Sequence, residues 1–155
     1  MKDHLHSRGM HHEDVVVTDK DATFYLWNLS GQMTGFVKYN PTSPKKGGKP
    51  SEQKYFMYGH GVWGLQYLNY KRPNLIVTEG IFDAVVAHNY GLNAIAVLSN
   101  NPKRLKNWLN TLNFKTTAYC DGDSAGKKLA KYCDNYVVMP NNLDLGNLNE
   151  YLSGR

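Results

Sequence analysis

Hydrophobic and polar positions follow two different rhythms along the chain. Between residues 15 and 39, runs of β-branched and aromatic residues alternate with polar residues and are separated by short polar turns, a pattern typical of an antiparallel meander. From Leu75 onward, short runs that are entirely apolar alternate with stretches of helical spacing. Such strands are typical of a parallel sheet covered by helices on both faces. The sequence therefore predicts an α/β protein.

Individual elements follow from these rhythms. The loop between residues 40 and 53 is rich in Pro, Gly, Ser and Lys and separates the two halves of the first region. We expect a small, mainly β, basic lobe over residues 1–74 and a parallel-sheet domain over residues 75–155. The predicted strands are 15–17, 23–27, 33–39, 75–78, 94–98, 116–120 and 136–139, and the predicted helices are a short one within 3–12 and then 81–90, 103–112 and 124–133.

Composition changes this picture little. The hydrophobic and charged fractions of the 155 residues are ordinary for a globular protein. No apolar run approaches the length of a membrane span, and the first residues form no apolar signal core. We expect a soluble, cytoplasmic protein without a membrane partner. The two cysteines, Cys120 and Cys133, have no second pair with which to build a zinc module, so they are expected to be reduced thiols.

Positive charge is concentrated in the first half. Between Lys38 and Arg72, seven basic residues accompany a single acid, Glu52. A patch of this kind can bind a nucleic-acid backbone through counterion release, and aromatic residues beside it offer rings on which bases stack. A solvated loop and buried aromatic rings are the alternatives. The candidate contact residues are Lys38, Lys45, Lys46, Lys49, Lys54 and Tyr55.

Acidic residues mark the other half. Asp121 and Asp123 follow a predicted strand and would project the same way from its carboxyl end, where open α/β sheets bind ligands. Two carboxylates this close repel unless a cation lies between them, and such oxygens suit Mg²⁺. A surface turn with Asp as a helix cap is the alternative. Of the seven acids after residue 74, five lie just beyond predicted strand ends: Glu79, Asp83, Asp121, Asp123 and Asp144.

The joint spacing of these residues resembles a known family. Glu79 with Asp83, then Asp121 with Asp123, then Asp144 ahead of Asn149 and Glu150, is similar to the Toprim domain of DnaG-type primases, topoisomerases and some nucleases. The resemblance implies that Glu79, Asp121 and Asp123 form a metal-binding centre for Mg²⁺ or Mn²⁺, with Asp83 and Asp144 as further ligands.

The region before residue 75 resembles the basic subdomain that precedes Toprim in bacterial and phage primases. The segments 27–37, 54–55 and 63–65 carry this similarity, and 5–10 resembles its beginning. A basic residue often stands near the position of His60 in that family, so the resemblance implies nucleotide contact at His60 that is weaker than in the family.

Together the two resemblances imply a primase-like nucleotidyltransferase that makes short RNA primers from NTPs on single-stranded DNA during DNA replication. A replicative helicase or a separate zinc-module protein would be a partner. A Toprim nuclease that nicks or cleaves nucleic acid with the same metal centre is one alternative. A primase-derived accessory that binds nucleic acid without catalysis is another.

Overall fold

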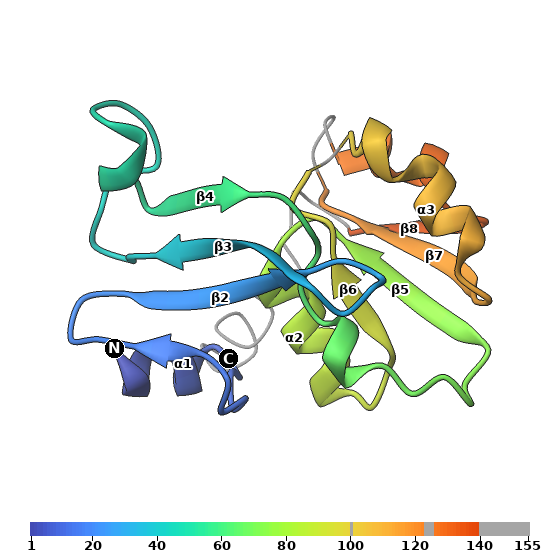
Figure 1. Cartoon of the computed structure of the whole chain (residues 1–155), viewed down its shortest axis with the longest axis horizontal. Helices are drawn as coiled ribbons and strands as arrows, with labels where there is room; N and C mark the ends of the chain where they lie inside the picture. The colour runs from blue at the N-terminus through green and yellow to red at the C-terminus, as the bar shows by residue number, and fades with distance from the viewer. Residues whose placement is uncertain (100, 123–125, 140–155) are drawn as a thin grey trace.

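A computed structural model describes residues 1–99, 101–122 and 126–139 of the chain, which contain two four-stranded sheets (Figure 1). The first sheet is an antiparallel meander in chain order, as the alternation predicts. Along its second strand, buried residues alternate with half-buried ones, so one face packs inward. Its strands are β1 (Val16–Val17), β2 (Ala22–Trp27), β3 (Met33–Tyr39) and β4 (Tyr55–Gly59).

The second sheet is parallel throughout and has the order β6-β5-β7-β8. From β5 the chain first builds β6 on one side and then crosses to build β7 on the other side. The strand order therefore reverses between β5 and β7, and a crevice opens at the carboxyl ends of strands at such a reversal. The strands are β5 (Asn74–Thr78), β6 (Ala94–Ala96), β7 (Lys115–Cys120) and β8 (Asn135–Val138).

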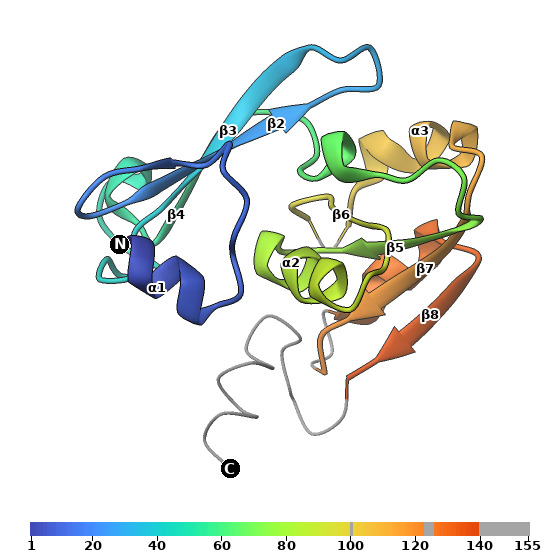
Figure 2. The same ribbon diagram turned by 90° about the horizontal axis from the view of Figure 1, so that it is seen from below.

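Helices cover both faces of this parallel sheet, which confirms the predicted fold class. Helix α2 packs with Ile76 on one face, whereas α3 and η4 pack with Leu75 and Val77 on the other. Figure 2 shows α2 on the side that faces α1 and the first sheet. The helices are α1 (Lys2–Ser7), α2 (Ile81–Asn89) and α3 (Lys106–Thr111), with 3₁₀ turns η1 (Pro50–Glu52), η2 (Leu65–Tyr67), η3 (Lys103–Leu105) and η4 (Gly126–Tyr132).

Three predicted helices differ from those observed, and the one predicted at 103–112 begins as the 3₁₀ turn η3 and is α-helical only over α3. The helix expected within 3–12 ends at Ser7, because Gly9 adopts a φ of 81° and the N–H groups of Gly9 and Met10 donate to the carbonyls of His6 and Leu5. These bonds form a Schellman motif, which stops a helix. The last predicted helix is a 3₁₀ helix, whose spacing aligns Leu129 with Tyr132 against the second core.

One hydrophobic core joins the two sheets. Its buried members come from α1, β2, β3, α2 and β6, so the inner face of the first sheet packs against the helix that covers the second. Trp63, 1% exposed, lies at the junction and exchanges backbone hydrogen bonds of 3.0 Å with Ala96 of β6. The neighbouring Val62 pairs in the same way with Trp27 of β2. The division of the chain into two domains between residues 74 and 75 stays a prediction.

A pair of histidines crosses the same junction. The His88 Nε2–H group donates to the Ala94 carbonyl at 2.9 Å, so in the neutral ring Nδ1 is left to accept from His12 Nε2 at 3.4 Å. His12 also stacks on Tyr67, with ring centroids 4.0 Å apart. Burial lowers the pKa of both histidines, and the pKa of His12 is lowered further by the charge that His88 would carry. The contact therefore requires His88 to be neutral, and burial favours the neutral form of both rings.

Acidification should weaken this junction. Because the pKa of each histidine is lower in the folded chain than its ordinary value of 6.5, the unfolded chain binds more protons below that pH. The free energy of unfolding should therefore fall as the pH drops from about 7.5 to about 5.5. Urea unfolding at a series of pH values measures this. The His12→Gln/His88→Gln double variant should show a flatter dependence, while the exposed control His60→Gln should follow the wild type. Equal slopes for all three proteins would contradict the assignment.

Candidate active site

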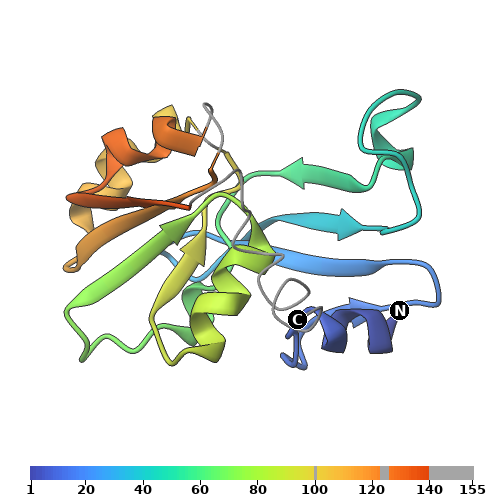
Figure 3. The same ribbon diagram turned by 180° about the vertical axis from the view of Figure 1, so that it is seen from behind.

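The predicted acids Glu79 and Asp121 meet where the strand order of the parallel sheet reverses. Thr78, the last residue of β5, pairs with Tyr119 of β7, so Glu79 and Asp121 leave the sheet at the ends of adjacent strands. Neighbouring strands lie about 4.8 Å apart. Figure 3 shows the carboxyl ends of β5 and β7 turned toward the first sheet.

A cavity of about 330 Å³ occupies this crevice. Three of the predicted acids line it together with residues of the first sheet and with Arg8, which follows α1. The site is thus built by both halves of the chain, which share the core described above. Its lining residues are Arg8, Val37, Tyr55, Met57, Glu79, Gly80, Ile81, Phe82, Asp83, Leu98 and Asp121.

The backbone around Glu79 is held on both sides. The buried Thr78 hydroxyl donates to the Gly80 carbonyl at 2.9 Å, and the Leu98 N–H group donates to the Glu79 carbonyl at the same distance. Leu98 itself has a φ of 61°, a left-handed conformation that costs a leucine roughly 1–2 kcal/mol. A strained residue beside the cavity shows that the surrounding contacts fix this turn.

Asp83 has a structural role that its spacing did not reveal. Its side chain is 6% exposed, and its Oδ2 atom accepts a hydrogen bond from the Gly80 N–H group at 3.1 Å, capping the first turn of α2. An acid at a helix N-terminus is also favoured by the helix dipole. Its role as a metal ligand therefore stays a prediction, and one of its oxygens is engaged with the backbone.

Arg8, the residue that follows α1, brings a positive charge to the cavity. Its guanidinium carbon lies 3.7 Å from the centroid of the Phe82 ring, and Nη1 donates to the Tyr39 hydroxyl at 3.3 Å. Burial disfavours the charge, but the phenol groups of Tyr39 and Tyr55 outweigh that cost and raise the pKa of Arg8. The residue is therefore a permanent cation at 8% exposure.

The inner face of the first sheet supplies the opposite wall. Val37 of β3 pairs with Met57 of β4, and Tyr39 pairs with Tyr55, so these four side chains share one face. The Tyr55 ring stacks on Tyr39 with centroids 5.0 Å apart and remains 46% exposed. Tyr55 thus offers an aromatic surface at the rim of the acidic cavity, as the nucleotide-contact hypothesis requires.

The predicted basic residues lie elsewhere. Lys38 is on the outer face of the first sheet and forms a salt bridge of 3.2 Å with Asp21. Lys54 is half-buried, and its backbone closes the loop between β3 and β4 through a 2.7 Å bond to Pro44. His60 is exposed and bonds through its backbone to Thr34. The three loop lysines, Lys45, Lys46 and Lys49, are exposed. The loop between β3 and β4 lies at the end of the first sheet far from the parallel sheet (Figure 1).

Two predicted ligands, Asp123 and Asp144, lie outside the described residues. Within residues 1–99, 101–122 and 126–139, no group of three His, Cys, Asp or Glu side chains is close enough to hold a metal ion. The described acids still fit Mg²⁺, because this ion usually binds through one or two carboxylates and keeps several waters. The oxygen-only donor set of Glu79 and Asp121 suits such an ion.

Arg8 is the main contributor to the site that the sequence did not assign. It lies 71 residues before Glu79, just after the end of α1, in a segment that the acidic spacing does not include. The available signal was the similarity of residues 5–10 to the start of the primase subdomain, which placed this segment in the fold without giving Arg8 a role. Val37 and Met57 were missed because an apolar residue in a predicted strand indicates a core position and not a binding site.

With this geometry established, comparison with solved structures defines the class of fold. The chain has the fold of the catalytic core of DnaG-type primases, which confirms the resemblance seen in the sequence at the level of structure. No protein-family model matches the sequence, and a search of curated proteins found no match.

Two solved structures illustrate the likeness. The primase catalytic core of E. coli aligns with 97% of this chain and 56% of its own, with a TM-score of 0.63 and 20% identity. The primase fragment of the bacteriophage T7 primase-helicase protein aligns with 90% of this chain and 61% of its own, with a TM-score of 0.61 and 13% identity.

A third similar structure is a DnaG primase catalytic domain bound to single-stranded DNA. It aligns with 99% of this chain and 57% of its own, with a TM-score of 0.62 and 20% identity. The chain thus spans little more than half the length of these structures. In the part of the chain that the structure describes, no helix is long and apolar enough to cross a membrane.

Proposed function

We propose that this chain is a primase-like, metal-dependent nucleotidyltransferase core that makes short RNA primers on single-stranded DNA. One observation carries the proposal: Glu79 and Asp121 leave adjacent strands at the reversal of the parallel sheet and share a cavity with the buried cation Arg8. Acids and a fixed cation around one cavity suit a reaction at a triphosphate. The primase-core fold supports the same class of chemistry by analogy.

Mg²⁺ or Mn²⁺ is the cofactor that these acids would hold. Glu79 and Asp121 would bind it, and we expect Asp123 to add the second carboxylate of the pair on that strand. A divalent ion at this place would neutralise charge on the triphosphate and on the attacking and leaving oxygens of an in-line transfer. Asp83 would keep the first turn of α2 in place through its bond to Gly80.

The remaining residues would bind and orient the nucleotide. Arg8 would stabilise phosphate charge, and because it is buried its attraction is weakened little by solvent. Tyr55 would stack on a base at the rim. Glu79 would hold the 3′-hydroxyl that attacks, besides its part in metal binding. A replicative helicase or a zinc-module protein is the class of partner that we propose for template engagement.

The loop between β3 and β4 is proposed to contact the template backbone. Replacing Lys45, Lys46 and Lys49 by alanine should weaken single-stranded DNA binding equally for all sequences and reduce the slope of log K against log salt by about 0.7 for each phosphate that the loop no longer neutralises. Fluorescence anisotropy over a salt series measures this. The matched control removes equal charge from η3 and α3 by replacing Lys103, Arg104 and Lys106 with alanine. An equal effect of the two triple variants would mean that the loop contributes only through the net charge of the protein and does not contact the template.

The proposed activity is tested on a denaturing gel. The protein is incubated with Mg²⁺ or Mn²⁺, labelled NTPs and single-stranded DNA, and products and template are resolved together, with Glu79→Gln as the control. Short new oligonucleotides that disappear in the variant are expected. A shortened template would instead support a Toprim nuclease, and an inert reaction with intact DNA binding would support an accessory protein.

A further inference from the structure

A basic, aromatic surface lies at the end of the parallel sheet away from the acidic cavity. It surrounds a hollow of about 550 Å³ where β5 and β7 begin. Lys71 and Arg72 belong to the basic stretch between Lys38 and Arg72, but no residue of this surface is among the candidate contact residues predicted from the sequence. Lys115 opens β7 and Asp121 follows its end, so the two places are roughly 17–20 Å apart at 3.3 Å per residue. The hollow is lined by Tyr70, Lys71, Arg72, Pro73, Leu112, Asn113, Phe114 and Lys115.

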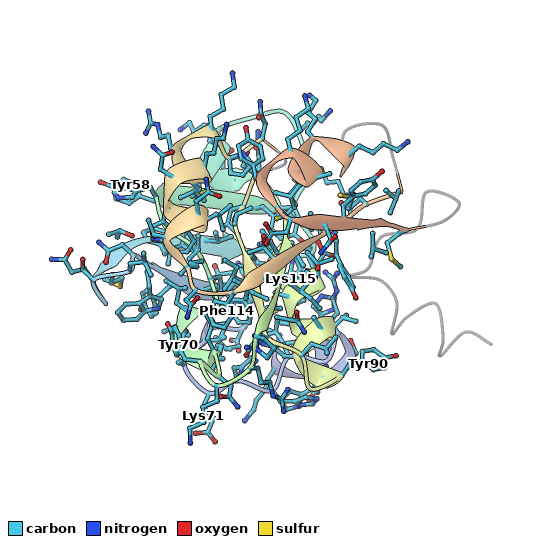
Figure 4. The ribbon with its side chains drawn as sticks, turned by 90° about the vertical axis from the view of Figure 1, so that its right-hand side faces the viewer. Tyr58, Tyr70, Lys71, Tyr90, Phe114 and Lys115 are labelled. Atoms are coloured by element: carbon cyan, nitrogen blue, oxygen red, sulfur yellow. The ribbon has the colours of Figure 1, made fainter. Side chains whose placement is uncertain are left out.

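Two rings form the centre of this surface. Tyr70 and Phe114 pack with centroids 5.6 Å apart and planes inclined by 37°. Tyr70 is 66% exposed, so its ring gains little from burial and presents most of its area to solvent. In Figure 4 the labelled side chains of Tyr70, Phe114, Lys71 and Lys115 gather over the start of these strands, whereas Tyr90 stands apart at the edge of the same view.

The turn that carries Tyr70 is firmly anchored. The side chain of Asn93, 7% exposed, donates to the Asn69 carbonyl at 2.8 Å and accepts from the Asn69 N–H group at 2.9 Å. The Asn69 side chain in turn accepts from the Lys71 N–H group at 3.0 Å. Arg72 donates to the Gly91 carbonyl, which ties the end of the turn to the loop after α2. The backbone that carries Tyr70 and Lys71 is therefore held in place before any ligand arrives, which lowers the entropic cost of binding.

The charge of the residues that line the hollow indicates which kind of ligand it binds. Among the residues that the structure describes, three cations line the hollow, Lys71, Arg72 and Lys115, and no carboxylate does. Exposed rings held beside cations are the arrangement by which proteins bind single strands without reading sequence, because every base has a face that can stack and every nucleotide carries a phosphate. An acidic peptide would satisfy the cations but has no flat face for Tyr70.

We infer that Tyr70 and Phe114, with Lys71 and Lys115, form a second contact site for single-stranded nucleic acid. A base stacks on the exposed face of Tyr70 while the lysines contact the flanking phosphates. The inference rests on this surface alone and stands whether or not the acidic cavity makes primers.

Binding of fluorescein-labelled oligothymidylate, followed by anisotropy at low salt, tests the site. Tyr70→Ala should weaken binding roughly 5- to 100-fold, the range for losing one stacked base, and Tyr70→Phe should retain the affinity because the ring remains. Tyr90→Ala is the matched control, since that tyrosine is 62% exposed and should not matter. If Tyr70→Ala binds as tightly as Tyr90→Ala, the site is wrong. Oligouridylate in a parallel series distinguishes RNA from DNA as the strand that binds.

A second measurement identifies the contact directly. An oligonucleotide containing 5-bromouracil, cross-linked by light to the wild-type protein and to Glu79→Gln, should label peptides containing Tyr70 or Phe114 in both. Cross-links confined to other peptides would overturn the inference. A polyglutamate peptide of matched charge that displaces the oligonucleotide and binds Tyr70→Ala as tightly as the wild type would also overturn it, in favour of an acidic protein partner. Loss of primer synthesis in Glu79→Gln with the cross-link retained separates this site from the proposed catalytic centre.

Discussion

Asp121→Asn should reduce primer synthesis by roughly 10²- to 10³-fold, the cost of removing one group that stabilises charge in a transition state. Asparagine keeps the shape of the side chain but loses the charge that would hold a divalent ion at the end of β7. The fold should remain, because removing one of the clustered carboxylates relieves repulsion in the metal-free protein. Quantitative gels give the rate, and urea unfolding gives the stability.

The control for this variant is Asp19→Asn, which removes the same charge from an exposed position in the first half of the chain. It should leave both the rate and the unfolding midpoint near their wild-type values. Full activity in Asp121→Asn would show that the chemistry does not depend on this acid. A large fall in its unfolding midpoint would show that Asp121 is structural.

Trp63→Ala should cost about 3–5 kcal/mol of folding free energy, the usual range for deleting a large core aromatic side chain. Trp63 packs edge-on against Phe24 of β2 and is in ring contact with His88 of α2, and its backbone pairs with β6. Its loss would therefore open a cavity between the first sheet and the parallel sheet. Because the walls of the acidic cavity come from both, activity should fall together with stability.

Urea unfolding of purified variants measures the loss. Trp108→Ala is the matched control, because Trp108 is the same residue type but only half-buried on α3. It should cost clearly less than Trp63→Ala. Equal losses would mean that Trp63 does not join the two sheets in the way its contacts indicate.

Most strands followed from the sequence because their patterns are local. The alternation in 23–27 and the apolar run 75–78 specify which faces are buried, and the observed strands β2 and β5 differ from these ranges by one residue. The crossing from β6 to β7 could not be derived from the sequence, because the hydrophobic pattern does not determine which strands lie next to each other in the sheet. That reversal is what brings Glu79 and Asp121 to adjacent strands.

The sequence predicted the acidic part of the site, because acids that follow predicted strands can be recognised from the sequence alone. Glu79, Asp83 and Asp121 do line one cavity, but the spacing could not show that Asp83 also caps α2. Arg8 was missed because its position depends on α1 packing under the first sheet, a contact between distant segments. Conversely, charge alone suggested Lys38, which the strand alternation places on the outer face beside Asp21.

Metal binding tests the central claim most directly, since it requires neither a template nor a partner protein. Electron paramagnetic resonance of free Mn²⁺ is recorded while the protein is added, in the presence of a nucleoside triphosphate, and Mg²⁺ is then used to compete. We expect the protein to bind Mn²⁺ beyond what the nucleotide alone takes up, and Glu79→Gln and Asp121→Asn each to lose most of that binding while Asp19→Asn retains it. Mn²⁺ binding that is unchanged in both cavity variants, or absent from the wild type, would contradict a metal centre between β5 and β7.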